Sequence, residues 1–145
     1  MIIVSKLNKP KHLKQVMHKD ARGSLTEIFL KKQIKFDFSK CITVTSKKNV
    51  IRGLHFQKKF PQHKIIFVLK GIINDFVVDI RKNSKTFGKV YKFKLIPGEA
   101  LIIPKKFAHG YSSMAKENIV VYFLSEDWHP LQDLNFFCSK YICKF

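Results

Sequence analysis

Residues 64–80 read KIIFVLKGIINDFVVDI, and this stretch carries the strongest structural signal in the chain. The apolar run at 64–69 ends at Lys70-Gly71, a turn signal, and a second apolar run at 72–80 follows directly. Short apolar runs separated by a turn are typical of strands, whereas a helical segment would be longer and would show a period of 3.6. The stretch therefore predicts two consecutive strands joined at Gly71.

Runs of the same kind recur on both sides. They cover residues 24–30, 41–45, 89–95, 100–103 and 118–124. Gly71, Gly88 and Gly98 stand at hairpin-like junctions, and helical periodicity is scarce. A spacing of about eight to twelve residues with Gly and Pro between the runs predicts an all-β sandwich or barrel, with a ligand site at one open end. No linker is visible, so we expect one domain over residues 1–145.

The charge of the chain is strongly unbalanced. Lys and Arg total 28 and Asp and Glu total 10, which gives a formal net charge of +18. Such a field attracts anions. The basic residues are spread in pairs such as Lys31-Lys32 and Lys105-Lys106, with no basic tail, zinc-finger spacing or basic helix. This pattern favours a surface covered with lysines over a nucleic-acid-binding site. A basic opening to the ligand site would also suit a pyrophosphate group.

The cysteines and the apolar runs indicate the cellular compartment in which the protein works. Cys41, Cys138 and Cys143 are odd in number and have no CxxC spacing, which indicates reduced thiols in a cytosol. Residues 1–14 read neither as a signal peptide nor as an anchor. No apolar run approaches the roughly 20 residues that span a bilayer. We therefore expect a cytoplasmic protein that does not engage a membrane.

Two motifs and one tyrosine can carry chemistry. The first motif is RGLHFQ at 52–57, in which Arg52 and His55 would fall on opposite faces of a regular strand, although a bulge at Gly53 could bring both toward one cavity. A His can act as a general base, and an Arg fork suits a phosphate oxygen. The second motif, GEALIIPKKFAHG at 98–110, predicts a strand, a tight turn and His109 near the start of the next strand. On spacing alone, the ring of His109 would hydrogen-bond to the backbone. Tyr122 is either a core residue or a general acid opposite His55.

Together these stretches resemble the dTDP-4-dehydrorhamnose 3,5-epimerase family. The matching segments are DARGSLTEIF at 20–29, VIRGLHFQ at 50–57, residues 62–88 with VDIRKNSKTFG at their end, LIIPKKFAHGYS at 101–112, and Tyr122-x-x-Ser125. The resemblance implies a cupin jelly roll that forms a homodimer and uses no cofactor. It implies an epimerase that exchanges protons at carbons next to the 4-keto group of a nucleotide-linked sugar, in a pathway leading to a surface polysaccharide.

The resemblance also implies roles for individual residues. His55 corresponds to the family's base and Tyr122 to its acid. Substrate contacts would come from Arg22, Glu27, Arg52, Lys64 and His109, with Arg22 reaching a neighbouring subunit. The chemistry suits these side chains: removing a proton beside a ketone leaves an enolate, which needs a positive donor such as Lys64. Reprotonation from the opposite face then inverts the centre.

This chain departs from the family at several positions. The Asp that pairs with the family's catalytic His is matched by Ser139 and Lys140, so Asp79 or another group would have to replace it. Lys40 and Ile42 lie where the family has Gln and Asn, Lys106 replaces a turn Gly, and Trp128 stands near a second family Tyr.

A metal site is not expected. His55, His63 and His109 suggest one, but cupin metal sites use a His-x-His pair, a Glu and a later His. Here Gln57 follows His55 at that spacing, and no Glu lies between Gly53 and Gly71. His55 and His109 are too few ligands, so we expect no catalytic metal.

Three other functions compete. Sugar 3,4-ketoisomerases share the fold and the enolisation chemistry but usually carry two His in the first motif, where this chain has His55 and then Gln57. A cupin without catalytic activity that binds an anionic ligand would fit the charge of +18 and the missing Asp. A structural subunit supporting a longer partner epimerase is a third possibility.

Overall fold

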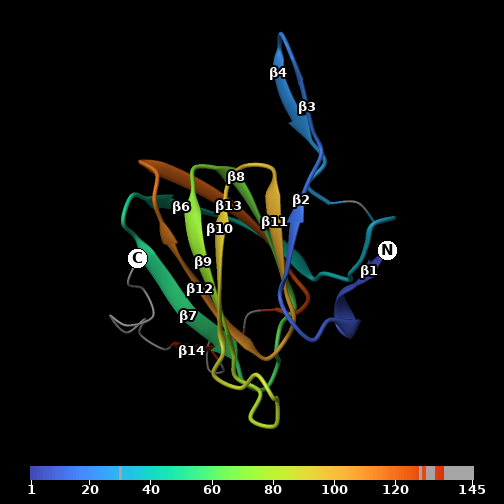
Figure 1. Ribbon diagram of the computed structural model, residues 1–145, viewed down its shortest axis with the longest axis vertical. Coiled ribbons are helices and arrows are strands. Elements are labelled where there is room, and N and C mark those ends of the chain that lie inside the picture. Colours follow the sequence, from blue (N-terminus) through green and yellow to red (C-terminus); the bar gives the residue numbers. More distant parts are fainter. Residues whose placement is uncertain (30, 128, 130–132, 136–145) are drawn as a thin grey trace.

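The computed structural model describes residues 1–145 except 30, 128, 130–132 and 136–145. Strands dominate it (Figure 1). The bounds are β1 Ile2–Ile3, β2 Lys11–Lys14, β3 Met17–Asp20, β4 Gly23–Thr26, β5 Ile34–Lys35, β6 Lys40–Lys47, β7 Ile51–Gln57, β8 Lys64–Lys70, β9 Ile73–Asp79, β10 Val90–Leu95, β11 Glu99–Ile103, β12 Phe107–Ser113, β13 Glu117–Leu124 and β14 Asp133–Asn135, with one 3₁₀ turn, η1, at Val4–Lys6. No helix in the described part is long and apolar enough to cross a bilayer.

Two five-stranded antiparallel sheets face each other. One, the β9 sheet, has the order β10-β9-β12-β7-β14, and the other, the β8 sheet, has the order β2-β11-β8-β13-β6. From β6 onward the chain changes sheet at almost every connection, which is the strand pattern of a jelly roll. The fold is therefore the cupin-type jelly roll expected from the sequence.

The expected hairpin junctions are only partly correct. Gly88 lies between β9 and β10, which do pair with each other. Gly71 and Gly98 lie in turns between strands of different sheets, so these two are crossovers and the hairpin prediction is wrong for them. Gly71 has φ +86°, and a Cβ there would lie 2.4 Å from Asn118 Oδ1. A turn residue sets where the chain reverses, but it does not decide which strand becomes the neighbour.

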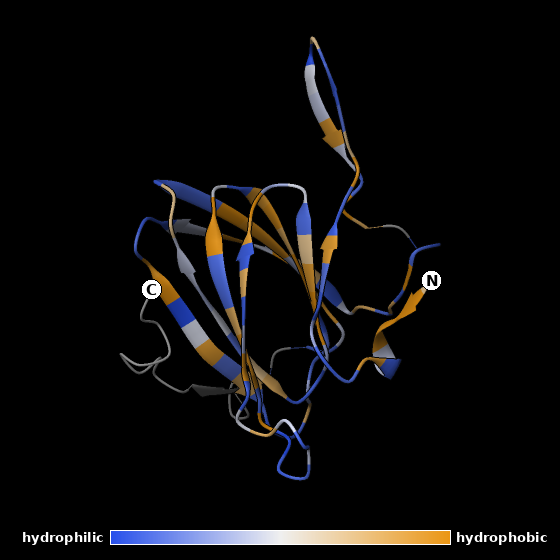
Figure 2. Cartoon of the chain, viewed as in Figure 1, coloured by the Kyte–Doolittle hydropathy of each residue, from blue (hydrophilic) through white to orange (hydrophobic). Residues whose placement is uncertain are grey.

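The core fills the space between the sheets. Its buried members come from both layers: Ile66, Val68, Ile73, Val77, Leu95, Leu101, Ile103, Phe107, Tyr111, Val120, Tyr122 and Leu124. A second cluster lies on the outer face of the β8 sheet, where Val4 and Ile34 of the N-terminal region pack against Ile65, Phe67 and Ile102. Figure 2 shows apolar residues along the strands of the sandwich, whereas the loop at its lower end is mainly hydrophilic.

The hairpin of β3 and β4 projects away from the sandwich (Figure 1). The sequence predicted a strand over 24–30, but β4 ends at Thr26, and residue 30 lies outside the described part. Leu25 is 63% exposed, so this hairpin has no core to bury its apolar side chains within one chain.

Candidate active site

A bulge in β7 places Arg52 and His55 on one face of the strand. His109 of β12 pairs with His55, and Tyr111 pairs with Arg52, with a register shift between the two pairs. Three steps along β7 thus match two along β12, which is the geometry of a β-bulge. The pairing therefore puts Arg52 and His55 on the strand face that carries His109 and Tyr111, as a bulge at Gly53 could do. Arg52 is exposed there and His55 is partly buried.

Glycine is required on both sides of this bulge. Gly53 has φ +104°, and a Cβ there would lie 2.6 Å from the backbone oxygen of His109 and 2.7 Å from Gly110 Cα. A Cβ on Gly110 would lie 2.5 Å from the backbone oxygen of Arg52. The two strands thus approach more closely than any side chain allows, and this approach sets the direction of His55.

The hydrogen-bond partner of the His109 ring is a carboxylate and not a backbone oxygen, which spacing alone had predicted. Its Nε2 lies 2.8 Å from Asp75 Oδ2, and the side chains are 4% and 0% exposed. The carboxylate therefore holds the imidazole ring of His109 in one orientation. Asp75 Oδ1 is buried and has no hydrogen-bond partner among the described residues. A buried acceptor of this kind is costly and is typical of a place where a ligand or water supplies the donor.

Tyr122 comes from the opposite sheet. Its ring on β13 lies 6.0 Å from that of His109 in an edge-to-face arrangement. Burial raises the pKa of Tyr122 well above its ordinary value of 10.0, and the nearby Tyr111 and Asp75 raise it further, while Arg52 opposes them. Tyr122 therefore keeps its proton at neutral pH.

One hydroxyl group and one backbone oxygen hold the guanidinium of Arg52. Arg52 Nε donates to Ser46 Oγ at 3.0 Å, and Arg52 Nη2 donates to the backbone oxygen of Thr45 at 3.2 Å. Ser46 Oγ also lies 2.9 Å from the hydroxyl of Tyr111, in a contact that is buried. Because β6 and β7 belong to different sheets, these bonds tie the guanidinium across the mouth of the sandwich.

Lys64 lies at the start of β8, half-buried. It pairs with Ile103 and Leu124, and strand alternation places it on the same face as Ile66 and Val68, which belong to the core. Lys64 thus enters the interior from the sheet that also carries Tyr122.

Arg22 and Glu27 lie apart from this group within one chain. Arg22 follows β3 in the projecting hairpin, its side chain is 90% exposed, and its Nη2 lies 2.7 Å from Asp20 Oδ2. The Arg22 guanidinium lowers the pKa of Asp20. Glu27 is exposed and follows β4. The structure therefore places His55, Lys64, His109 and Tyr122 on the facing sides of the two sheets, with Arg52 exposed beside them, and leaves Arg22 and Glu27 apart from this group.

Asp79, considered above as a replacement for the family's Asp, bonds to its own loop. Its two oxygens accept hydrogen bonds from Arg81, Ser84 and Thr86, all within seven residues. Trp128, Ser139 and Lys140 lie outside the described residues. Within the described residues, no group of three or more His, Cys, Asp or Glu could hold a metal ion. The expectation of a metal-free site stays a prediction.

Sequence reasoning missed three residues of this interior: Ser46, Asp75 and Tyr111. Asp75 had a detectable signal, because a carboxylate inside the apolar run IINDFVVDI must find a partner when the strand is buried. Ser46 and Tyr111 carry no such signal in the sequence, since each is compatible with many environments.

The fold and this interior define a class, the cupin-type jelly roll with polar groups gathered between its sheets. Residues 5–139 match the family model described as dTDP-4-dehydrorhamnose 3,5-epimerase. The chain belongs to the dTDP-4-dehydrorhamnose 3,5-epimerase family.

Relatives of known name lie in the same family. The chain is 36% identical over 124 residues to the dTDP-4-dehydrorhamnose 3,5-epimerase of Methanothermobacter thermautotrophicus, covering 81% of this chain and 67% of that one. It is 40% identical over 91 residues to the Escherichia coli K12 enzyme, covering 61% of this chain and 49% of that one. The chain thus spans about half to two thirds of the length of these relatives.

Solved structures agree with the fold. The epimerase of Bacillus anthracis with TDP and PPi bound superposes with a TM-score of 0.86 at 32% identity, covering 93% of this chain and 83% of that one. The Legionella pneumophila dTDP-6-deoxy-D-glucose-3,5-epimerase in complex with dTDP-4-keto-L-rhamnose gives 0.88 at 29% identity, covering 98% and 80%.

Proposed function

We propose that this protein is an epimerase that acts at C3, C5 or both of a dTDP-linked 4-keto-6-deoxy sugar. The observation that carries the proposal is the β7 bulge, because it turns Arg52 and His55 toward the same interior as His109 and Tyr122. The family and the ligands named for its solved members support the substrate class.

The reaction is an enolisation followed by reprotonation. His55 takes the proton from a carbon next to C4, the electrons of that C–H bond form a carbon–carbon double bond, and the carbonyl electrons move onto oxygen. Tyr122 then gives its proton to the same carbon from the other face, and the carbonyl reforms with the centre inverted. The raised pKa of Tyr122 supports this assignment, because a proton donor must hold its proton before the step.

The developing oxyanion needs a donor. Lys64 and His109 come from different sheets, and both face the interior, so they can approach one oxygen from two sides. The bond from Asp75 fixes the ring of His109, which lowers the reorganisation needed during the reaction.

Arg52 suits the diphosphate. Its Nε and Nη2 are held by Ser46 and Thr45, so the fork is already oriented when the nucleotide arrives. The projecting hairpin suits a homodimer, in which Arg22 and Glu27 of one chain would complete the site of its neighbour. We expect no metal or organic cofactor and a cytoplasmic location.

Two alternatives remain testable with the same assay. A 3,4-ketoisomerase would use the same base and move the carbonyl to C3. A non-catalytic anion-binding cupin is favoured by one observation, the net charge of +18.

Deuterium incorporation tests the proposal. The protein would be incubated in deuterated water with dTDP-4-keto-6-deoxyglucose and followed by NMR. We expect deuterium at C3, C5 or both, and a loss of at least about 100-fold in rate for His55→Ala and Tyr122→Phe. His12→Ala is the matched control, because His12 lies outside this interior and pairs with Glu99. A new 3-keto product would identify the protein as a ketoisomerase. If no deuterium exchange occurs with any 4-keto sugar nucleotide, the epimerase proposal fails and the non-catalytic anion-binding cupin is favoured.

A further inference from the structure

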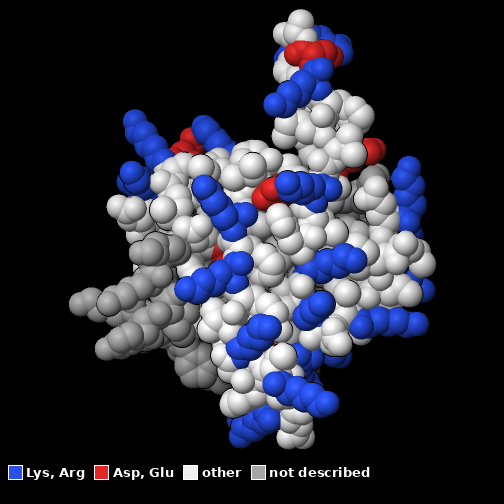
Figure 3. Space-filling view, in the orientation of Figure 1, with Lys and Arg blue, Asp and Glu red and all other residues white. Residues whose placement is uncertain are grey.

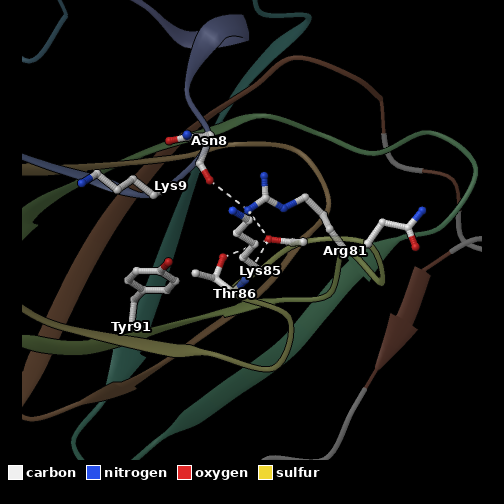
Figure 4. A pocket seen from close by; sticks show the side chains of 8 residues that line it. Asn8, Lys9, Arg81, Lys85, Thr86 and Tyr91 are labelled. Carbon is white, nitrogen blue, oxygen red and sulfur yellow. Dashed lines mark hydrogen bonds between the residues drawn. The ribbon is translucent and has the colours of Figure 1, made fainter.

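We propose a second binding site, for a small phosphate-bearing anion, in a hollow between residues 8–9 and the loop that joins β9 to β10. The hollow has a volume of about 570 Å³ and is lined by Asn8, Lys9, Arg81, Asn83, Ser84, Lys85, Thr86 and Tyr91 (Figure 4). None of these side chains is a carboxylate, and Asn8, Lys9, Asn83, Lys85 and Tyr91 can each donate a hydrogen bond to a ligand. Such a lining suits a ligand whose outer atoms are anionic oxygens.

The loop is built around a buried carboxylate. Asp79 is 0% exposed, and Arg81 reaches it with two bonds, Nε to Oδ1 at 2.8 Å and Nη2 to Oδ2 at 2.7 Å. The hydroxyls of Ser84 and Thr86 donate to Oδ2 at 2.8 and 2.6 Å. These bonds fix the loop from inside, so its outward groups are already arranged and binding costs little ordering.

The same arginine joins the two walls. Arg81 Nη2 donates to the backbone oxygen of Asn8 at 2.9 Å, which holds the N-terminal segment against the loop. Lys9 and Lys85 are thereby brought to one hollow from positions far apart in the chain (Figure 4). The convergence is a product of the fold, not of a run of lysines in the sequence.

The positive charge here is not compensated locally. Asp79 balances Arg81, but neither Lys9 nor Lys85 takes part in an ion pair among the described residues. Residues 1–19 and 80–98, which form both walls, contain no Asp or Glu. Figure 3 shows Lys and Arg spread over this view of the molecule with few acidic residues between them. The hollow therefore carries two lysines and no carboxylate among its lining residues, within a field that already attracts anions.

The shape favours a small molecule over a polymer. The hollow is bounded by two segments, and Tyr91 forms part of its wall, with Lys89 Nζ 5.1 Å from the centre of its ring. An aromatic wall beside cationic groups suits a nucleotide, whereas the cationic groups alone suit an inorganic phosphate or polyphosphate. A nucleotide and an inorganic phosphate both carry the phosphate group that the site would bind. The site contains none of the residues proposed above for epimerisation.

Calorimetry with inorganic pyrophosphate tests the site. The Arg52→Ala background removes the proposed substrate-diphosphate contact, so that the remaining binding reports on the hollow. In that background we expect Lys9→Ala/Lys85→Ala to weaken pyrophosphate binding at least about 10-fold. The matched control is Lys31→Ala/Lys32→Ala, which removes the same charge from exposed positions elsewhere and should change the affinity less than about 2-fold.

Equal weakening in both double variants would overturn the proposal, because binding would then follow the overall charge. No measurable binding in the Arg52→Ala background would overturn it too. The two sources are separated by titrating dTDP: tighter binding than pyrophosphate that is lost in Tyr91→Leu identifies a nucleotide, and equal binding identifies free phosphate. Deuterium exchange should be unchanged in Lys9→Ala/Lys85→Ala, so failure here and failure of the epimerase proposal are distinguishable.

Discussion

His109 and Asp75 are diagonal neighbours across the pair of strands β12 and β9, and a buried hydrogen bond of 2.8 Å joins their side chains. The two residues lie 34 positions apart in the chain. One carboxylate oxygen serves His109, and the other has no partner in the described part. The pair thus provides an oriented imidazole and an acceptor that is available to a ligand.

Removing the carboxylate should cost stability and rate. In Asp75→Ala the buried His109 loses its acceptor, so we expect unfolding free energy to fall by roughly 1–3 kcal/mol in urea titrations. Asp75→Asn should recover most of that loss, because its amide oxygen can accept, but it should not restore the exchange rate. Asp20→Ala is the control, since its ion pair is exposed and screened by water, so its removal should change the unfolding free energy little. Equal losses in Asp75→Ala and Asp20→Ala would contradict this account.

The hydroxyl of Tyr111 should act through Ser46 on Arg52. Tyr111→Phe removes only that hydroxyl, and Ser46→Ala removes the group that both neighbours contact. We expect each to raise KM for the nucleotide sugar about 5-fold with a smaller change in kcat, because Arg52 would meet the diphosphate less well oriented.

A double-mutant cycle separates this from simple loss of packing. If the two hydroxyls act as one unit, the double variant should resemble the single variants, with a coupling of about 1 kcal/mol, which is the free energy of one 5-fold effect on KM. Additive effects on KM would show that Tyr111 does not work through Ser46.

Gly53 should tolerate no side chain. In Gly53→Ala the new Cβ would meet the backbone of His109 and Gly110 in addition to the strain of a positive φ. We expect a loss well above the roughly 1–2 kcal/mol that left-handed strain alone costs, together with loss of exchange activity. Gly88→Ala isolates the strain, because φ is +78° there and a Cβ would meet nothing within 4 Å. Thermal unfolding that is shifted equally in the two variants would rule out the close approach as the cause.

Asp79 should make stability depend on pH on the acid side. The Arg81 guanidinium, with the Thr86 and Ser84 hydroxyls, holds the pKa of Asp79 well below its ordinary value of 3.8, although burial opposes this. A depressed pKa in the folded state adds stability that is fully present above the unfolded value and is lost as pH falls toward the folded value.

The measurement compares wild type with Asp79→Asn by urea unfolding from pH 7 down to about pH 2.5. The variant should be less stable by roughly 1–3 kcal/mol at pH 7, and the gap should shrink as pH falls below 4. A gap that stays constant over this range would mean that the charge of Asp79 does not contribute.

The local pattern singled out the two motifs of the candidate site, and the resemblance to the family supplied the roles of their residues. A bulge at Gly53 was one way for Arg52 and His55 to share a face, and the turn before His109 was expected from Gly98 and Pro104. The residues that orient this chemistry were not predicted. Asp75 pairs with His109 from 34 residues away and Tyr111 pairs with Ser46 from 65 residues away, so no local window contains both members of either pair. Ser46 also accepts from Arg52, six residues on, but the two residues lie in different sheets.

The sequence by itself determined that the chain forms strands and roughly where most of them lie, because these depend on neighbouring side chains and on the Gly and Pro between the runs. Only the tertiary structure decided which strands become neighbours, that Gly71 and Gly98 are crossovers, and that His109 meets Asp75. The reason is physical: register between distant strands is set by the burial of both sheets at once, and polar partners inside the sandwich are chosen by that register.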